Sequence, residues 1–175
     1  IVEARQEHAM LDLSLFRKPA FTGVSVVAWA LSAGMFAMFL YLTLYIQDVL
    51  GYSPLEAGVR FLPITLLSFF VAPIAGRLTG RVPARVLLGL GLILVGVGLL
   101  LMRGIELGDD WTTLLPGFLV AGVGIGLTNP AIASTAIGVV APFRAGMASG
   151  INNTFRQVGI ATGVAALGAI FQSRI

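Results

Sequence analysis

Five stretches of this sequence are almost free of charged residues, and this pattern constrains the fold more than any other feature. Four carry no charge, and the fifth, residues 145–173, carries only Arg156. About 20 mostly apolar residues are needed to cross the hydrocarbon core of a bilayer, which is about 30 Å thick. We therefore expect an all-α integral membrane protein with about five transmembrane helices, at residues 21–47, 54–77, 85–102, 111–138 and 144–171.

Composition agrees with a membrane location and excludes several functions. Hydrophobic residues make up 57% of the chain and charged residues 11%, whereas soluble domains carry about 25% charged residues. The basic residues are scattered over short loops and form no continuous patch, so we expect no nucleic-acid partner. The chain has no Cys and one His, His8, which argues against a disulfide framework, a metal site or a bound cofactor. No nucleophile or acid/base pair is visible, so we do not expect an enzyme.

The distribution of Arg and Lys predicts the orientation in the membrane, because cytoplasmic loops are enriched in these residues. Seven of them fall on one side of the predicted spans, and only Arg60, Arg103 and Arg174 fall on the other. We expect residues 1–19 to form a cytoplasmic, interfacial lead-in and residues 20–175 to form the five-helix transmembrane segment, in the inner (plasma) membrane. The seven residues on the cytoplasmic side are Arg5, Arg17, Lys18, Arg77, Arg81, Arg85 and Arg144.

The start of the second predicted span has the features of a helix N-terminus. Ser53 is a good N-cap, Pro54 suits the first helical position, and Glu56 completes a capping box. Glu56 also precedes Arg60 by four residues, which is a favourable order on a helix. Pro63 and Pro73 predict bends further along this span.

The segment NNTFRQVG, residues 152–159, places polar side chains at membrane depth. Arg156 follows Arg144 by twelve residues, or about 18 Å of helix, and a guanidinium there needs polar partners or a water-filled cavity. The spacing of Asn152, Asn153, Arg156 and Gln157 predicts one polar strip. This strip either hydrogen-bonds neighbouring helices or contributes to a transport cavity or its gating.

The last two predicted spans also contain pairs of glycines four residues apart, a spacing that lets helix backbones approach closely. We expect these pairs to nest the fourth and fifth spans tightly. Between them, Asn129 and Pro130 predict either a helix break whose freed carbonyls line a cavity or a simple packing kink. The glycine pairs are Gly122 and Gly126, Gly146 and Gly150, and Gly159 and Gly163.

The loop GRLTGRVPAR, residues 76–85, carries three arginines between two spans. Anchoring by positive charge on the cytoplasmic side explains its charge. The spacing of Gly76 and Gly80 further predicts a close helix approach, which suits a hinge.

Four segments together resemble the second half of a major facilitator superfamily transporter of the fourteen-helix drug:proton antiporter branch. They are LDLSLFRKPAF, YIQDVLGYSPLEAGVRFLP, GRLTGRVPAR and GMASGINNTFRQVGIATGVA. Within the third, Gly76, Arg81 and Arg85 match the signature loop of the superfamily, while Gly80 replaces its acidic residue and Pro83 its second glycine.

The resemblance implies five helices of a six-helix half-bundle, with the sixth helix and the N-terminal half of the transporter outside these residues. It implies alternating-access efflux of drugs or other hydrophobic or cationic small molecules from the membrane, driven by a proton gradient and without a cofactor. A specific metabolite permease of the same superfamily, and a non-transporting membrane scaffold or sensor, are the alternatives.

Overall fold

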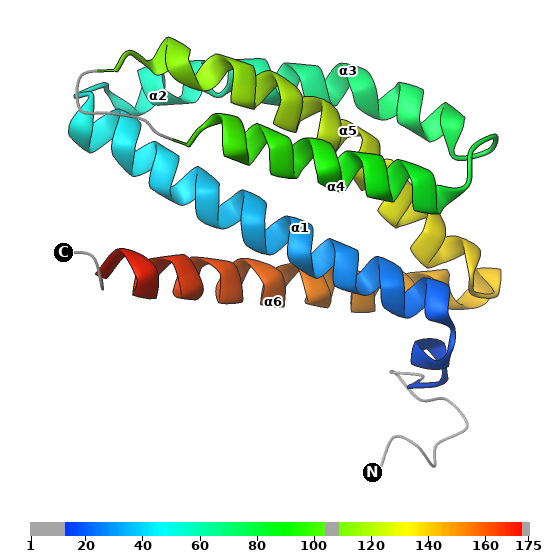
Figure 1. The fold of residues 1–175 in the computed structure, drawn as a ribbon. Coiled ribbons are helices and arrows are strands. Elements are labelled where there is room, and N and C mark those ends of the chain that lie inside the picture. The colour runs from blue at the N-terminus through cyan, green and yellow to red at the C-terminus, as the bar shows by residue number, and fades with distance from the viewer. Residues whose placement is uncertain (1–12, 104–108, 173–175) are drawn as a thin grey trace. The chain divides into compact units, whose positions relative to one another are not determined.

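The computed structural model describes residues 13–103 and 109–172, and within these residues the chain is helical and contains no strand (Figure 1). This confirms the prediction of an all-α fold. The chain divides into two compact units: unit 1 contains residues 1–37 and 132–175, and unit 2 contains residues 38–131. The elements are η2 (Leu13–Arg17), α1 (Pro19–Leu44), η3 (Tyr45–Val49), α2 (Pro54–Arg60), α3 (Leu62–Leu78), α4 (Ala84–Leu101), η4 (Trp111–Leu114), α5 (Leu115–Gly138), η5 (Pro142–Arg144) and α6 (Ala145–Gln172).

The first span is longer than predicted because α1 continues into η3, one turn of π-helix. The amide of Leu50 donates to the carbonyl of Tyr45, five residues back, at 3.0 Å. The chain then turns at Gly51, whose φ of 73° is accessible mainly to glycine. The aromatic and apolar periodicity of this segment did not indicate the wider final turn.

The second span begins with the predicted capping box and is broken near Pro63. The Ser53 hydroxyl accepts from the amide of Glu56, and the Glu56 carboxylate accepts from the amide of Ser53 at 2.8 Å. Helix α2 ends at Arg60, and α3 starts at Leu62 with its axis bent by 41°. The break follows from Pro63, which has no amide hydrogen to continue the ladder. Pro73, in contrast, lies inside α3 without ending it.

In unit 2, α4 and α5 pack through two reciprocal glycine pairs. A Cβ atom on Gly98 would lie 2.8 Å from the Gly117 carbonyl oxygen, and one on Gly117 would lie 2.7 Å from the Gly98 carbonyl oxygen. Gly91 and Gly124 face each other in the same way, with distances of 2.9 and 2.6 Å. Only glycine allows two helix backbones to come this close.

The face of α4 away from these glycines consists of exposed apolar side chains. Leu90, Ile93 and Leu100 are more than half exposed, whereas Leu87 and Val95 are buried. This pattern suits a helix that contacts lipid on one side. Because the sequence of this span is apolar all round, it gave no sign of the glycine contact on the other side of the helix.

Gly122 and Gly126 make the predicted close approach, but their partner is α3. A Cβ atom on Gly122 would lie 2.8 Å from the Ile64 carbonyl oxygen, and one on Gly126 would lie 2.9 Å from the Ser68 carbonyl oxygen. The prediction that these glycines nest the fourth span against the fifth is therefore wrong. A spacing of four residues shows that a helix has a flat face but not which helix packs on it.

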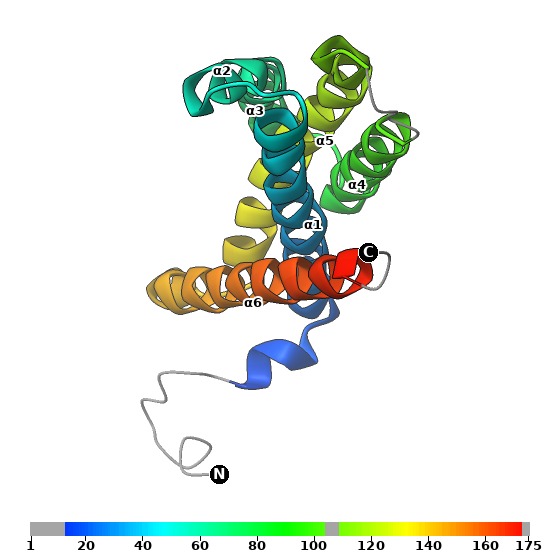
Figure 2. The same cartoon turned by 90° about the vertical axis from the view of Figure 1, so that its left-hand side faces the viewer.

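In unit 1, α6 packs on the middle of α1 through Gly159 and Gly163 (Figures 1 and 2). A Cβ atom on Gly159 would collide with the carbonyl oxygen of Trp29, and one on Gly163 would collide with that of Ala33. Gly146 and Gly150 behave differently: in the described part of the chain, nothing lies within 4 Å of a Cβ added at either. Their predicted role in close helix packing is not seen, because both are exposed.

The lead-in segment η2 packs on the N-terminal part of α6. Leu15 is buried with Phe21, Ala148 and Ile151 in one apolar cluster, and the ring of Phe16 lies 5.8 Å from that of Phe155. The Lys18 ammonium donates to the carbonyl of Val139, just after the end of α5. The described part of the lead-in is therefore anchored to α6 and to the turn before it; residues 1–12 lie outside the described residues.

Among the described residues, three helical segments are long and apolar enough to cross a membrane: Pro19–Val49, Ala84–Leu101 and Trp111–Gly138. The bent pair α2 and α3 counts as a fourth if it forms one span. Helix α6 has 28 residues, enough for a crossing, but its polar segment keeps it out of this apolar set. The fifth span thus stays a prediction.

Candidate functional site

The polar side chains of α6 do not form a single strip. Asn152 is buried, Arg156 is half-buried, and both line one cavity together with the exposed Asn153. Gln157 is exposed and is not among the residues that line this cavity. The structure therefore brings together three of the four predicted residues.

This polar cavity has a volume of about 280 Å³ and lies between the last turns of α5 and the first half of α6. Helix α5 contributes a wall of small and branched apolar residues, and α6 contributes the polar groups. The small side chains of Ala133, Ala136, Ser149 and Gly150 leave the space that larger residues would fill. The lining residues are Ile132, Ala133, Ala136, Ile137, Ser149, Gly150, Asn152, Asn153 and Arg156.

Asn152 is the most constrained polar residue of the cavity. Its side chain is 7% exposed, and its Nδ2 atom is buried without a hydrogen-bond partner in the described part of the chain. A buried donor without a partner costs about 1–3 kcal/mol in stability. Such a group is typical of a site that is completed by a ligand or by another part of a larger protein.

The position of Arg156 explains how the chain tolerates a charge in this helix. It is the twelfth residue of α6, or about 17 Å along the helix at 1.5 Å per residue. A half-buried guanidinium that lines a cavity with two asparagines avoids direct exposure to hydrocarbon.

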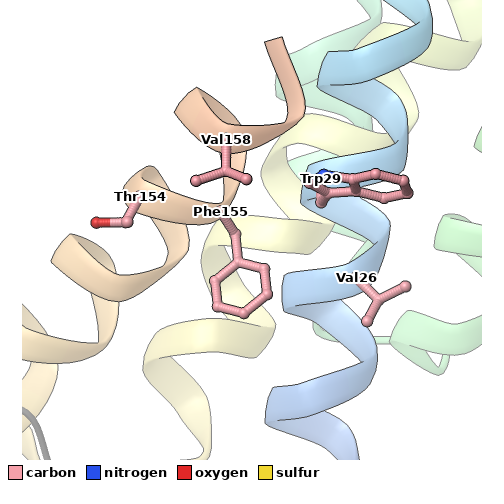
Figure 3. A pocket seen from close by; sticks show the side chains of 5 residues that line it. All are labelled: Val26, Trp29, Thr154, Phe155 and Val158. Carbon is pink, nitrogen blue, oxygen red and sulfur yellow. The ribbon is translucent and has the colours of Figure 1, made fainter. Parts of the chain in front are cut away.

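The opposite side of α6 lines an apolar pocket of about 310 Å³ (Figure 3). Thr154, Phe155 and Val158 come from α6, and Val26 and Trp29 come from α1. The one hydroxyl, that of Thr154, donates within the helix to the Gly150 carbonyl at 3.1 Å, so it leaves the pocket walls apolar. The sequence did not predict this pocket, although Thr154 and Val158 share a helix face.

Two other predicted features do not contribute to the polar cavity. Helix α5 runs without interruption from Leu115 to Gly138, so the predicted break at Asn129 and Pro130 is absent. Neither residue is among those that line the cavity. The alternative, a simple packing kink at these two partly buried residues, stays a prediction.

The arginine loop is a short exposed turn between α3 and α4. Arg81 and Arg85 are exposed, and the Thr79 hydroxyl donates to the carbonyl of Gly76 at 2.6 Å. In the described part of the chain, nothing lies within 4 Å of a Cβ added at Gly76, and the only such contact of Gly80 is 3.9 Å, to Arg77 of the same turn. The predicted close helix approach at these glycines is therefore not present.

Comparison with known proteins identifies the class. The family described as the Major Facilitator Superfamily matches residues 3–164. The chain belongs to this superfamily, and it is a multi-pass membrane segment of it.

Curated relatives come from several bacteria. The chain is 33% identical to the multidrug resistance protein Stp of Mycobacterium tuberculosis, over 97% of this chain and 31% of that protein. It is 31% identical to the methylenomycin A resistance protein of Streptomyces coelicolor, over 98% of this chain and 36% of that protein. It is 28% identical to the multidrug efflux pump LfrA of Mycolicibacterium smegmatis, over 95% of this chain and 33% of that protein. The chain thus spans about a third of the length of these relatives.

Proposed function

We propose that this chain is a segment of a proton-coupled exporter of drugs or other hydrophobic compounds. The polar cavity beside α6 carries the proposal, because it places Asn152 and Arg156 at mid-helix depth around space for a small molecule. Membership of the superfamily and the resistance and efflux named in its relatives support it. Secondary transporters of this kind bind substrate near the bilayer midplane, between two structural repeats.

In this proposal, the chain works together with an N-terminal half of the same transporter in the bacterial plasma membrane. The lead-in, the arginine loop and the turn before α6 face the cytoplasm, in line with the exposed Arg17, Arg81 and Arg144. The proton gradient supplies the energy, and no bound cofactor takes part.

Gradient-driven transport into vesicles tests the proposal. Everted vesicles that contain the full-length transporter expose its cytoplasmic face, so export in the cell corresponds to uptake into the vesicle. Fluorescent lipophilic compounds are added outside the vesicles, and their uptake is followed with and without an imposed proton gradient. We expect transport that an ionophore abolishes and that vesicles without the protein lack. If the protein is correctly folded but transport is the same with and without the proton gradient, the proposal is contradicted and a scaffold or sensor is favoured.

A further inference from the structure

We propose that Asn152 is the specificity-determining residue of the polar cavity, and that it selects compounds by donating a hydrogen bond to one uncharged oxygen, such as that of a ketone, ester or amide. This inference rests on the proposed function and names the chemical group by which its substrates are recognised. Selection by this group makes no demand on the net charge of the compound.

The amide of Asn152 is placed as a recognition group would be. Asn152 is the eighth residue of α6, and its side chain is 7% exposed. Its Nδ2 atom is buried without a hydrogen-bond partner in the described part of the chain, although the residue lines a cavity of about 280 Å³. Most buried polar groups in proteins are paired. An unpaired donor beside a cavity therefore indicates where the acceptor of a ligand binds.

The other polar side chains that line the cavity do not supply this acceptor among the described residues. Arg156 follows one turn later on α6, but a guanidinium has only N–H donors and cannot accept from Asn152. Ser149 and Asn153 carry oxygens, yet both residues are exposed and neither pairs with the Asn152 amide nitrogen. The acceptor is therefore expected from the compound that occupies the cavity.

The walls and the size of the cavity define the rest of the compound. The wall from α5 is hydrocarbon and consists of Ile132, Ala133, Ala136 and Ile137. The volume of about 280 Å³ is close to the lower end of the range for ligand sites, about 300–1,000 Å³. The cavity thus suits a small apolar compound, or one end of a larger compound, that carries a single acceptor oxygen toward Asn152.

A buried donor of this kind discriminates by chemical group. A compound that lacks the acceptor leaves the donor of Asn152 unpaired, and sites built around a hydrogen bond reject such analogues more strongly than apolar pockets reject a changed methylene group. Because the amide of Asn152 carries no charge, an uncharged oxygen is sufficient for the hydrogen bond. Two neutral compounds that differ only in this oxygen should therefore be distinguished.

Equilibrium binding of such a pair tests the inference without requiring transport. The probes are tritiated 2-acetylnaphthalene and 2-ethylnaphthalene, which share the naphthalene ring and differ in a ketone oxygen. Their dissociation constants are measured for the full-length transporter in lipid nanodiscs, and binding to empty nanodiscs is subtracted. The ratio of the two constants is compared between protein variants, so the different solubilities of the probes in lipid cancel.

The Asn152→Leu variant keeps a side chain of similar size and removes the amide. We expect it to shift the ratio about fivefold or more against the ketone, the effect of losing one hydrogen bond. Gln157→Leu makes the same exchange at an exposed position outside the cavity and should change either constant less than about twofold.

Two further measurements separate recognition from a structural role. A hydrogen bond lowers the stretching frequency of a carbonyl, so the infrared band of the bound ketone, labelled with carbon-13 at its carbonyl, should move to higher frequency in Asn152→Leu and stay in place in Gln157→Leu. Without ligand, Asn152→Leu should be at least as stable to heat as the unmodified transporter, because it removes a buried, unpaired donor.

An unchanged ratio in Asn152→Leu would overturn the inference, as would the absence of saturable ketone binding to the unmodified transporter. A clear loss of thermal stability in Asn152→Leu would also overturn it, since the amide would then pair with another part of the transporter. The proposed function fails separately: the expected shift in the ratio, without any gradient-driven transport, would support the role of Asn152 and contradict proton-coupled export.

Discussion

The guanidinium carbon of Arg60 lies 3.3 Å from the centre of the Tyr52 ring. The ring of Trp111 lies near the same group, 5.5 Å away. Arg60 thus connects the segment before α2, the end of α2 and the start of η4. Its Nη1 donates to the carbonyl of Glu56 at 2.9 Å, while the Glu56 carboxylate is used by the cap at Ser53. The favourable order of Glu56 and Arg60 was recognised in the sequence, but the side chains have different partners.

Replacing Arg60 by Lys should destabilise the end of α2. Lys keeps the charge but cannot stack a planar group on Tyr52, and a cation–π contact contributes about 0.5–2 kcal/mol. Thermal unfolding of the full-length protein measures the loss. Arg77→Lys, at an exposed position on α3, is the control and should have no effect. Equal stability of both variants would show that the ring contacts do not hold this end together.

Gly159→Ala should lower the stability of unit 1. The added methyl group would collide with the Trp29 carbonyl and push α6 away from α1, and overpacking of this kind typically costs about 1–3 kcal/mol. Gly150→Ala, on the same helix, meets open space in the described structure and should be neutral or stabilising. The two variants are compared by thermal unfolding, and equal melting temperatures would contradict the close contact of α1 and α6.

A second matched pair tests the contact of α4 with α5. Gly98→Ala places a methyl group 2.8 Å from the Gly117 carbonyl oxygen, whereas Gly96→Ala has no neighbour within 4 Å in the described residues. We expect only Gly98→Ala to destabilise, by about 1–3 kcal/mol. Chemical denaturation of the purified transporter distinguishes them. A loss with Gly96→Ala alone would mean that α4 packs on the other face.

Ser53→Ala should weaken the start of α2. It removes the side-chain oxygen that accepts from the Glu56 amide, and loss of an N-cap costs about 0.5–2 kcal/mol. Hydrogen exchange of the amides in the first turn of α2 should become faster. Ser53→Asp keeps an acceptor and should restore most of the protection; fast exchange in both variants would exclude the cap as the cause.

Local features of the fold could be predicted from the sequence because they depend on nearby residues. The capping box at Ser53 and the break near Pro63 follow from backbone hydrogen bonding over a few positions. The partner of Gly122 could not be predicted, since spacing indicates a packing face and not the helix that covers it. The pairs formed by Gly91 and Gly98 were missed because a uniformly apolar helix shows no contrast between its faces.

The candidate site could likewise be predicted only where it depends on the spacing of residues within one helix. Asn152 and Arg156 are four residues apart and share a helix face, so their meeting in one cavity was predictable. Gln157 is rotated from Asn152 by about 140° around the helix axis, too far to join them. That Asn152 alone would be deeply buried depends on the walls from α5, and the position of those walls cannot be obtained from the sequence of α6.

The role of the polar cavity is tested most directly by measuring gradient-driven transport of a fluorescent lipophilic compound. The full-length transporter is compared with its Arg156→Gln and Gln157→Leu variants at matched levels of folded protein. We predict that Arg156→Gln reduces efflux about tenfold or more, because it removes a charged group that faces the ligand, and that Gln157→Leu leaves it almost unchanged. Unchanged efflux with Arg156→Gln would contradict the assignment of this cavity as the substrate site and leave Arg156 with a role in helix packing only.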